Sequence, residues 1–125
     1  MNTKILKEIG LTETEIKIYF ALLGLGATSS GKIFHETGIH RRNLYDALNK
    51  LISKGLVTYV KENKIKFFQA KNPENILNYI EEQKSKIEEK KNELQKLIPE
   101  LKEKFNSLTP EIEAEIYRGE EGIKT

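Results

Sequence analysis

The stretch that decides the fold is residues 28–70, TSSGKIFHETGIHRRNLYDALNKLISKGLVTYVKENKIKFFQA. It opens with three hydroxyl side chains that suit helix N-caps, which predicts a short helix broken at Gly38. A second helix is predicted from about His40 to Lys54, with Gly55 capping its end. The apolar residues of this segment recur at helical spacing and form one stripe, Leu44, Leu48, Leu51 and Ile52. Two helices joined by a tight turn that contains glycine are typical of a helix-turn-helix.

The spacing of apolar residues then changes from helical to alternating. Residues 57–60 and 65–70 are rich in β-branched and aromatic side chains, which predicts two strands. The polar segment between them, residues 61–64, is predicted to be the turn of a hairpin with a basic tip. A hairpin that directly follows a helix-turn-helix is predicted to be a wing.

The residues before this stretch predict two more helices. A short one is expected to stop at Gly10, and a clearer one begins at Thr12, which has the capping-box spacing with Glu15. One buried face is predicted from Ile16, Tyr19, Phe20 and Leu23. Gly24 and Gly26 are expected to end this helix.

A long, highly charged helix is predicted after Asn72-Pro73, an N-cap followed by proline at the first helical position. Apolar residues recur every seven positions at Ile80, Ile87, Leu94, Leu101 and Leu108, and the companion positions are Leu77, Lys84, Lys91, Ile98 and Phe105. Pro99 is expected to kink this helix without ending it. Because residues 81–96 are too polar for a core helix, the narrow stripe predicts a seam with a second copy, in parallel or antiparallel orientation. The expected dimerisation residues are Leu77, Ile80, Ile87, Leu94, Ile98, Leu101 and Phe105.

The predicted fold is therefore mainly α with a small β-hairpin. A winged helix-turn-helix domain is expected in residues 1–72, and a long coiled-coil dimerisation helix in residues 73–108. Residues 109–125 are expected to hold a short strand, because apolar and acidic residues alternate at 111–116, and then a turn and the first residues of a further part.

The net charge of +2 conceals an asymmetry along the chain. Residues 1–72 hold 12 Lys and Arg against 6 Asp and Glu, whereas residues 73–125 hold 9 against 13. The whole basic excess lies in residues 28–71, where 9 bases face 3 acids. A basic module joined to an acidic one favours nucleic-acid binding. The competing interpretation is an ordinary solvated surface.

Polar side chains off the apolar stripe of the second helix are the candidate DNA contacts. Arg and Asn make paired hydrogen bonds to base edges in the major groove, and Tyr and Lys more often hold phosphates. The wing lysines are predicted to contact phosphate or the minor groove, or else only to protect an exposed hairpin edge from aggregation. The full set of candidates is Ser30, His40, Arg41, Arg42, Asn43, Tyr45, Asn49, Lys50, Lys61, Lys64 and Lys66.

No catalytic residue, metal site or cofactor is expected. Residues 26–32 have the spacing of a phosphate-binding loop, but Ile33 stands where that motif needs Ser or Thr, and a helix precedes it. His35 and His40 have no acidic cluster beside them, and the chain has no cysteine. With no long apolar run and no signal peptide in the sequence, a cytoplasmic location is expected.

These patterns together resemble the TrmB family of archaeal transcription regulators. The matching residues are Leu11-Thr12-Glu13-Thr14-Glu15, Tyr19, Leu22-Leu23, Gly38-Ile39, Leu44-Tyr45, Leu48, Leu51 and Lys54-Gly55-Leu56-Val57. Phe67-Phe68-Gln69-Ala70 with Asn72-Pro73 resembles the end of the family's wing, and Ile116-Tyr117-Arg118-Gly119 with Gly122-Ile123 resembles the start of its effector domain.

The resemblance implies a homodimer on a palindromic operator, with Arg41, Arg42 and Tyr45 facing DNA from the recognition helix. His40 departs from the family, where Pro or another turn residue is common at this position. Family members with a sugar-binding domain continue beyond the length of this chain. The resemblance therefore implies that residues 109–125 hold the start of an effector domain that is truncated or absent, and no small-molecule effector is expected to bind this chain.

The leading prediction is a sequence-specific DNA-binding transcription regulator with double-stranded DNA and a second copy as partners, and not an enzyme. The alternative is a winged-helix adaptor that binds proteins of the transcription machinery. The excess of Lys and Arg in residues 1–72 favours DNA over this alternative. A nucleotide-hydrolysing enzyme has only the defective phosphate-loop spacing in its favour.

Overall fold

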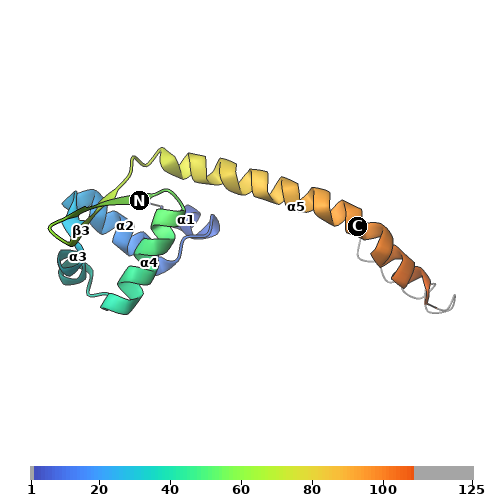
Figure 1. Ribbon diagram of the computed structural model, residues 1–125, viewed down its shortest axis with the longest axis horizontal. Coiled ribbons are helices and arrows are strands. Elements are labelled where there is room, and N and C mark those ends of the chain that lie inside the picture. The colour runs from blue at the N-terminus through green and yellow to red at the C-terminus, as the bar shows by residue number, and fades with distance from the viewer. Residues whose placement is uncertain (1, 109–125) are drawn as a thin grey trace. The chain divides into compact units, whose positions relative to one another are not determined.

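The computed structural model describes residues 2–108, and Figure 1 shows its helices and strands. In chain order they are α1 (Lys4–Glu8), α2 (Glu13–Leu25), β1 (Thr28–Ser29), α3 (Ser30–Thr37), α4 (Arg41–Ser53), β2 (Val57–Glu62), β3 (Ile65–Ala70) and α5 (Asn75–Asn106). The chain divides into two compact units, one ending at Gln83 and the other beginning at Lys84. The strand and effector start predicted in residues 109–125 lie outside the described residues.

The core of the first unit lies where α2 packs against α3, α4 and β3. Its fully enclosed apolar side chains include Ile18, Leu22, Ile33, Leu44, Leu48, Leu51 and Leu56. Burial of each such side chain contributes about 1.5–3 kcal/mol, so this one cluster fixes how the helices pack together. The predicted stripe of α4 is confirmed at its three leucines, while Ile52 is only partly buried at the edge of the core.

The start of α2 is as predicted, and its predicted buried face is confirmed at Ile16 and Tyr19 and in part at Phe20, but not at Leu23. The Thr12 hydroxyl accepts a hydrogen bond from the Glu15 N–H at 3.1 Å, and the Glu15 carboxylate accepts from the Thr12 N–H, which completes the capping box. Leu23 is 48% exposed, although it was predicted to be buried, and Ile18 and Leu22 are buried in its place. The buried face is turned because α2 packs against β3 and two helices at once. The helix continues to Leu25, so Gly24 does not end it.

Burial also changes one titratable group on α2. The hydroxyl of Tyr19 donates a hydrogen bond to the carbonyl oxygen of Lys71 at 3.4 Å. Desolvation raises the pKa of Tyr19 above its usual value. This tyrosine therefore stays protonated and works as a hydrogen-bond donor that ties α2 to the segment after β3.

An enclosed ion pair joins α2 to α4. The Lys54 ammonium lies 2.5 Å from Oε2 of Glu15 and donates a second hydrogen bond to the Gly10 carbonyl at 3.2 Å. The Glu15 side chain is 1% exposed and that of Lys54 is 17% exposed, so little water reaches the pair. The Lys54 ammonium also lies 5.9 Å from the centre of the Tyr79 ring. One side chain thus connects the loop before α2, the end of α4 and the first turns of α5.

The hairpin is confirmed, with a shorter turn and one strand that was not predicted. β2 and β3 pair antiparallel from Val57 opposite Ala70 to Glu62 opposite Ile65, so only residues 63 and 64 form the turn, not 61–64. β1 pairs antiparallel with the other edge of β3, which makes the sheet order β1-β3-β2. Two of the three hydroxyl residues predicted as N-caps therefore form β1. Ser29 occupies the N-cap position of α3 without a side-chain hydrogen bond.

The helix predicted after Pro73 begins two residues later, at Asn75, because residues 73 and 74 form a turn. The Asn72 side chain still accepts a hydrogen bond from the Glu74 N–H at 2.9 Å. Tyr79 is buried against the core of the first unit, and Ile80 is partly buried beside it. The predicted continuity through Pro99 is confirmed, since α5 runs on to Asn106. None of the helices within residues 2–108 combines the length and the apolar character that crossing a membrane requires.

The enclosed ion pair leads to a prediction about stability. Lys54→Met should lower the free energy of unfolding by about 3 kcal/mol, because it leaves the Glu15 carboxylate buried without its partner. Lys50→Met is the matched control, since Lys50 pairs with Asp46 at 3.3 Å on an exposed surface. That change should cost less than about 0.5 kcal/mol. Urea unfolding followed by circular dichroism measures both, and equal losses would contradict the role of the Glu15 pair.

Candidate nucleic-acid interface

The helix-turn-helix is formed by α3, a short turn and α4. Gly38 has a φ of +71°, a left-handed conformation that glycine adopts without strain, and its N–H donates to the Phe34 carbonyl at 2.7 Å. Ile39 packs partly buried against the core, which fixes the turn from inside. His40 is the N-cap of α4, so the predicted helix start is confirmed to within one residue.

The exposed residues of α4 fall on three sides of the helix. At about 100° per residue, Arg42 and Asn49 lie opposite the buried leucines and face solvent. Arg41 and Tyr45 lie on the flank next to α3 and the wing, where they line hollows with Ser30. The predicted DNA contacts on α4 are therefore not on one face.

Asn43 and Lys50 lie on the flank that faces α2. They line a hollow of about 200 Å³ with Thr12 and Thr14, at the start of α2. The Lys50 ammonium is also paired with the Asp46 carboxylate. These two residues therefore lie apart from the wing lysines, although the sequence predicted both sets as candidate DNA contacts.

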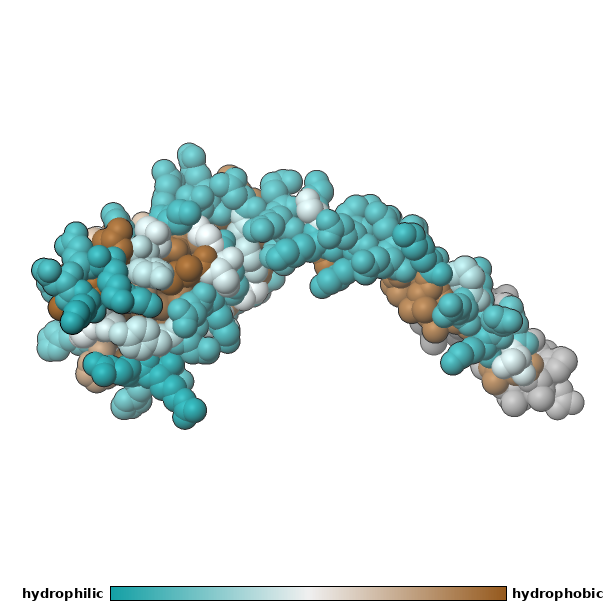
Figure 2. All heavy atoms as spheres, viewed as in Figure 1, coloured by the Kyte–Doolittle hydropathy of each residue, from teal (hydrophilic) through white to brown (hydrophobic). Residues whose placement is uncertain are grey.

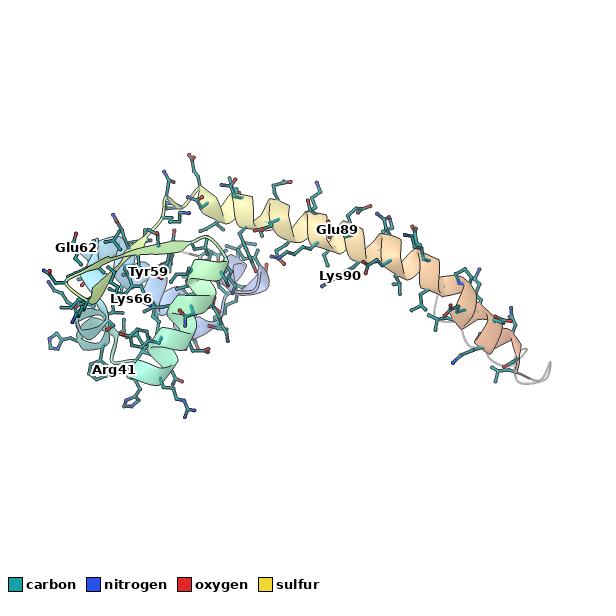
Figure 3. The ribbon with its side chains drawn as sticks, viewed as in Figure 1. Arg41, Tyr59, Glu62, Lys66, Glu89 and Lys90 are labelled. Atoms are coloured by element: carbon teal, nitrogen blue, oxygen red, sulfur yellow. The ribbon has the colours of Figure 1, made fainter. Side chains whose placement is uncertain are left out.

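A groove of about 380 Å³ lies between the helix-turn-helix and the wing. It is lined by Ser30, Tyr45, Lys61, Lys64, Ile65 and Lys66. Lys61 and Lys66 stand directly opposite each other on β2 and β3, and Figure 3 labels Lys66 on this hairpin. Three lysines gather here with the hydroxyls of Ser30 and Tyr45. The groove thus concentrates hydrogen-bond donors and positive charge, which suit the phosphates of a nucleic acid.

Two of the side chains at this groove are held by aromatic contacts. The Tyr45 hydroxyl shares a hydrogen bond of 2.8 Å with the Ser30 hydroxyl, and the Tyr45 ring meets the buried Phe68 ring edge-on at 6.3 Å. The Lys66 ammonium lies 4.6 Å from the centre of the Tyr59 ring, as expected for a cation–π contact. Figure 3 labels Tyr59 and Lys66 on the same hairpin. These contacts orient Tyr45 and Lys66 before any ligand arrives.

Lys64 is presented by an unusual turn. Asn63 and Lys64 have φ values of +50° and +67°, as the two central residues of a type I′ hairpin turn require. Asparagine tolerates this conformation, but lysine adopts it at a cost of about 1 kcal/mol. Glycine is the usual residue at the second of these positions. A lysine kept where glycine suits the backbone is consistent with a functional need for its charge.

A second hollow, of about 260 Å³, lies at the start of α4. Ser30, Phe34, His40 and Arg41 are among the residues that line it, and Figure 3 labels Arg41 at the start of α4. The Phe34 and His40 rings lie 6.4 Å apart, and Phe34 remains largely exposed. Phe34 was not among the predicted contacts. Its only signal in the sequence is an aromatic residue next to Ile33, which takes the buried position of this short helix.

Within residues 2–108, no three His, Cys, Asp or Glu side chains come together as metal ligands. His35 is exposed, and His40 has the Phe34 ring as its neighbour. Residues 26–32, with the phosphate-loop spacing, follow α2 and contain β1 and the start of α3, whereas a phosphate-binding loop joins a strand to a helix. The arrangement of side chains is suited to binding a polyanion.

Comparison with known proteins gives the family. The model of the family described as "Sugar-specific transcriptional regulator TrmB" matches residues 6–74, which span the elements from α1 to β3. The chain is 35% identical over 97 residues to the HTH-type sugar sensing transcriptional regulator TrmBL1 of Pyrococcus furiosus. That match covers 77% of this chain and 28% of the relative, so the chain spans less than a third of the relative's length.

Two solved structures share the fold. TrmBL2, an archaeal chromatin protein, matches with a TM-score of 0.69 and 23% identity over 86% of this chain and 42% of that protein. A MarR-family transcriptional regulator from Silicibacter pomeroyi matches with a TM-score of 0.53 and 15% identity, over 96% and 74% of the two chains. These likenesses confirm a winged helix-turn-helix followed by a long helix. Since the family model covers more than half of the sequence, the chain belongs to the TrmB family of transcriptional regulators.

Proposed function

We propose that this chain is a sequence-specific DNA-binding transcription regulator that acts as a homodimer on a palindromic operator. The observation that carries the proposal is the groove in which Lys61, Lys64 and Lys66 of the wing meet Tyr45 and Ser30 of the helix-turn-helix. It adjoins α4, whose outer side is free to enter a DNA groove. The family membership and the relatives' description as transcriptional regulators support the same function.

The two parts of the interface have different tasks in this proposal. An α-helix is about 10–12 Å across with its side chains, and the major groove of DNA is about 12 Å wide. α4 enters that groove with Arg42 and Asn49 outermost, the residue types that bind guanine and adenine edges in pairs. The wing lies over the flanking backbone, where its lysines contact phosphates without reading sequence.

The homodimer is proposed from the apolar stripe of α5. Ile87, Leu94 and Leu101 are 63%, 53% and 46% exposed, which is unusual for large apolar side chains placed at regular spacing on one helix. An operator with two half-sites needs two recognition helices about 34 Å apart, and a single winged helix supplies one. Leu77 is also exposed, whereas Ile80 is partly buried in its own unit and has less surface to offer a partner.

An adaptor that binds proteins remains the second candidate function. It is favoured by the exposed apolar side chains of Val60 and Ile65 on the wing. Salt separates the two functions, because DNA binding releases counterions and weakens steeply as salt rises. We expect affinity for random duplex DNA in a gel shift to fall by orders of magnitude between low and moderate salt. Absence of binding at low salt would favour the adaptor.

The assignment of α4 to the major groove leads to a prediction about Arg42. Arg42→Ala should weaken binding to the selected operator by roughly 1–3 kcal/mol and relax base preference, because a pair of hydrogen bonds to one base is lost. Lys17→Ala removes the same charge from the exposed side of α2 and is the control. Selection of duplexes from a random pool, followed by fluorescence anisotropy, gives both quantities. An unchanged base preference in Arg42→Ala would place the reading residue elsewhere.

The strained wing turn gives a prediction in which stability and binding move in opposite directions. Lys64→Gly should raise the free energy of unfolding by about 1 kcal/mol, since glycine adopts the positive φ freely. The same change should weaken binding to all duplexes alike and reduce the slope of log affinity against log salt by about 0.9. Lys64→Ala should weaken binding equally but without stabilising the fold. Salt titrations of DNA binding and urea unfolding are measured on both variants. DNA affinity that is unchanged in Lys64→Gly would exclude a phosphate contact by Lys64.

The proposed dimer gives a third prediction. Leu94→Asp combined with Leu101→Asp should yield a monomer whose winged helix stays folded, because both leucines lie outside the first unit. DNA affinity should fall steeply, since binding at two linked half-sites is lost. Lys96→Asp with Glu103→Asp places aspartates on the opposite side of the same helix and should leave the dimer intact. Sedimentation equilibrium measures the mass of each variant, and circular dichroism shows whether it is folded. A dimer that persists in the leucine variant would place the interface elsewhere.

A further inference from the structure

We infer that two copies of this chain pair their α5 helices antiparallel, in the register that sets Leu94 of one copy against the partner's Lys91. The inference rests on the proposed homodimer and specifies its geometry. It is carried by the charged residues within and beside the exposed stripe of α5. These charges favour one antiparallel register over parallel pairing and over the neighbouring antiparallel registers.

The stripe lies on a helix with little else to cover it. From Lys84 to Glu100 every residue of α5 is exposed. Figure 2 shows brown apolar side chains on the C-terminal half of α5 between teal charged ones. The exposed large apolar residues in this part of the chain include Leu94, Leu97, Ile98 and Leu101. Leu97 widens the stripe by one position and was not part of the predicted seam.

Two lysines interrupt the stripe and decide against parallel pairing. In a parallel, in-register pair each residue of the seam faces its own copy. Lys84 would then face the partner's Lys84, and Lys91 would face the partner's Lys91. Two like-charged layers, separated only by the Ile87 layer, would then lie in the middle of the seam. No attraction between opposite charges at the flanking positions would offset this repulsion. These positions would place Gln83 near the partner's Glu88, Lys90 near its Gln95 and Leu97 near its Lys102.

Antiparallel pairing separates the lysines from each other. With Lys91 against the partner's Leu94, the same register sets Lys84 against the partner's Leu101 and Ile87 against the partner's Ile98. Each lysine then lays its aliphatic stem along a leucine while its ammonium reaches water at the edge of the seam. Every layer contains at least one apolar side chain, and no layer contains two charges of the same sign.

The flanking charges select this register among the antiparallel ones. It places Glu81 opposite the partner's Lys102, twice in the symmetric dimer, and brings no like charges together on either flank. A shift by seven residues in one direction would set Glu88 against the partner's Glu88 and Lys90 against its Lys90. A shift in the other direction would set Lys90 against the partner's Lys104, and this repulsion would offset the attraction of Glu88 to the partner's Lys102. Like charges in such positions destabilise a pair, so the register that sets Leu94 against the partner's Lys91 is favoured.

The absence of cysteine from this chain makes a crosslinking test direct. In the antiparallel register, Leu101 of one copy lies beside the partner's Lys84, and the two Leu101 positions are about 25 Å apart along the helix axis. A disulfide needs Cα atoms within about 7 Å. Lys84→Cys and Leu101→Cys chains, one of them tagged, are mixed, allowed to exchange, oxidised and run on a non-reducing gel. The mixture should give the mixed disulfide, and each variant alone should give no more dimer band than Glu89→Cys on the outer side.

The outcomes separate the inference from the proposed homodimer. Self-crosslinking of Leu101→Cys above the Glu89→Cys control would show parallel pairing, and the homodimer would stand. A dimer in sedimentation without the mixed disulfide would overturn the register. If Leu101→Cys weakens the dimer, Glu81→Cys mixed with Lys102→Cys tests the same register on the flank, and absence of that disulfide also overturns it. A wild-type chain that sediments as a monomer would refute the homodimer itself.

Discussion

The contact of Lys54 with Glu15 holds the winged unit in its working arrangement. Glu15 completes the N-cap of α2, and Lys54 is the residue at which α4 ends. Their ion pair fixes the end of α4 to the start of α2. The same ammonium binds the Gly10 carbonyl and lies against the Tyr79 ring at the start of α5. A buried carboxylate is costly without a partner, so the pair forces three segments that are distant in sequence to meet at one point.

Local patterns were sufficient to predict every helix and the two strands of the hairpin, but not β1. The capping box of Thr12 and Glu15, the leucine spacing of α4 and the alternation after Gly55 each depend on residues close together in sequence, and the structure has all three. The basic tip of the hairpin was predicted for a similar reason, because the lysines of a polar turn face solvent or a ligand, whereas the groove that they line with Ser30 and Tyr45 was not predicted. Both inferences need only periodicity and chain order.

What sequence could not give depends on contacts between distant segments. Leu23 fits a helical stripe as well as Leu22 does, and only the packing of α2 between β3 and its neighbouring helices exposes it. β1 has two residues, too few for any strand pattern, and exists because β3 offers it a free edge. Asn43 and Lys50 look equivalent to Arg42 along the chain, yet the position of α2 gives them a different neighbourhood. The turn was predicted too long because strand pairing extends through Lys61 and Glu62.

The short strand β1 has a consequence for how DNA would be recognised. It pairs Thr28 with Phe68 and Ser29 with Phe67, and α3 begins at the very next residue. The wing is thereby bonded to the helix-turn-helix rather than hinged on it, so the gap between Lys66 and α4 is set before binding. A fixed separation between the wing and α4 favours duplexes whose grooves already match that separation. In the proposed complex, base pairs that touch no side chain would then influence affinity through the width and stiffness they impart to the double helix.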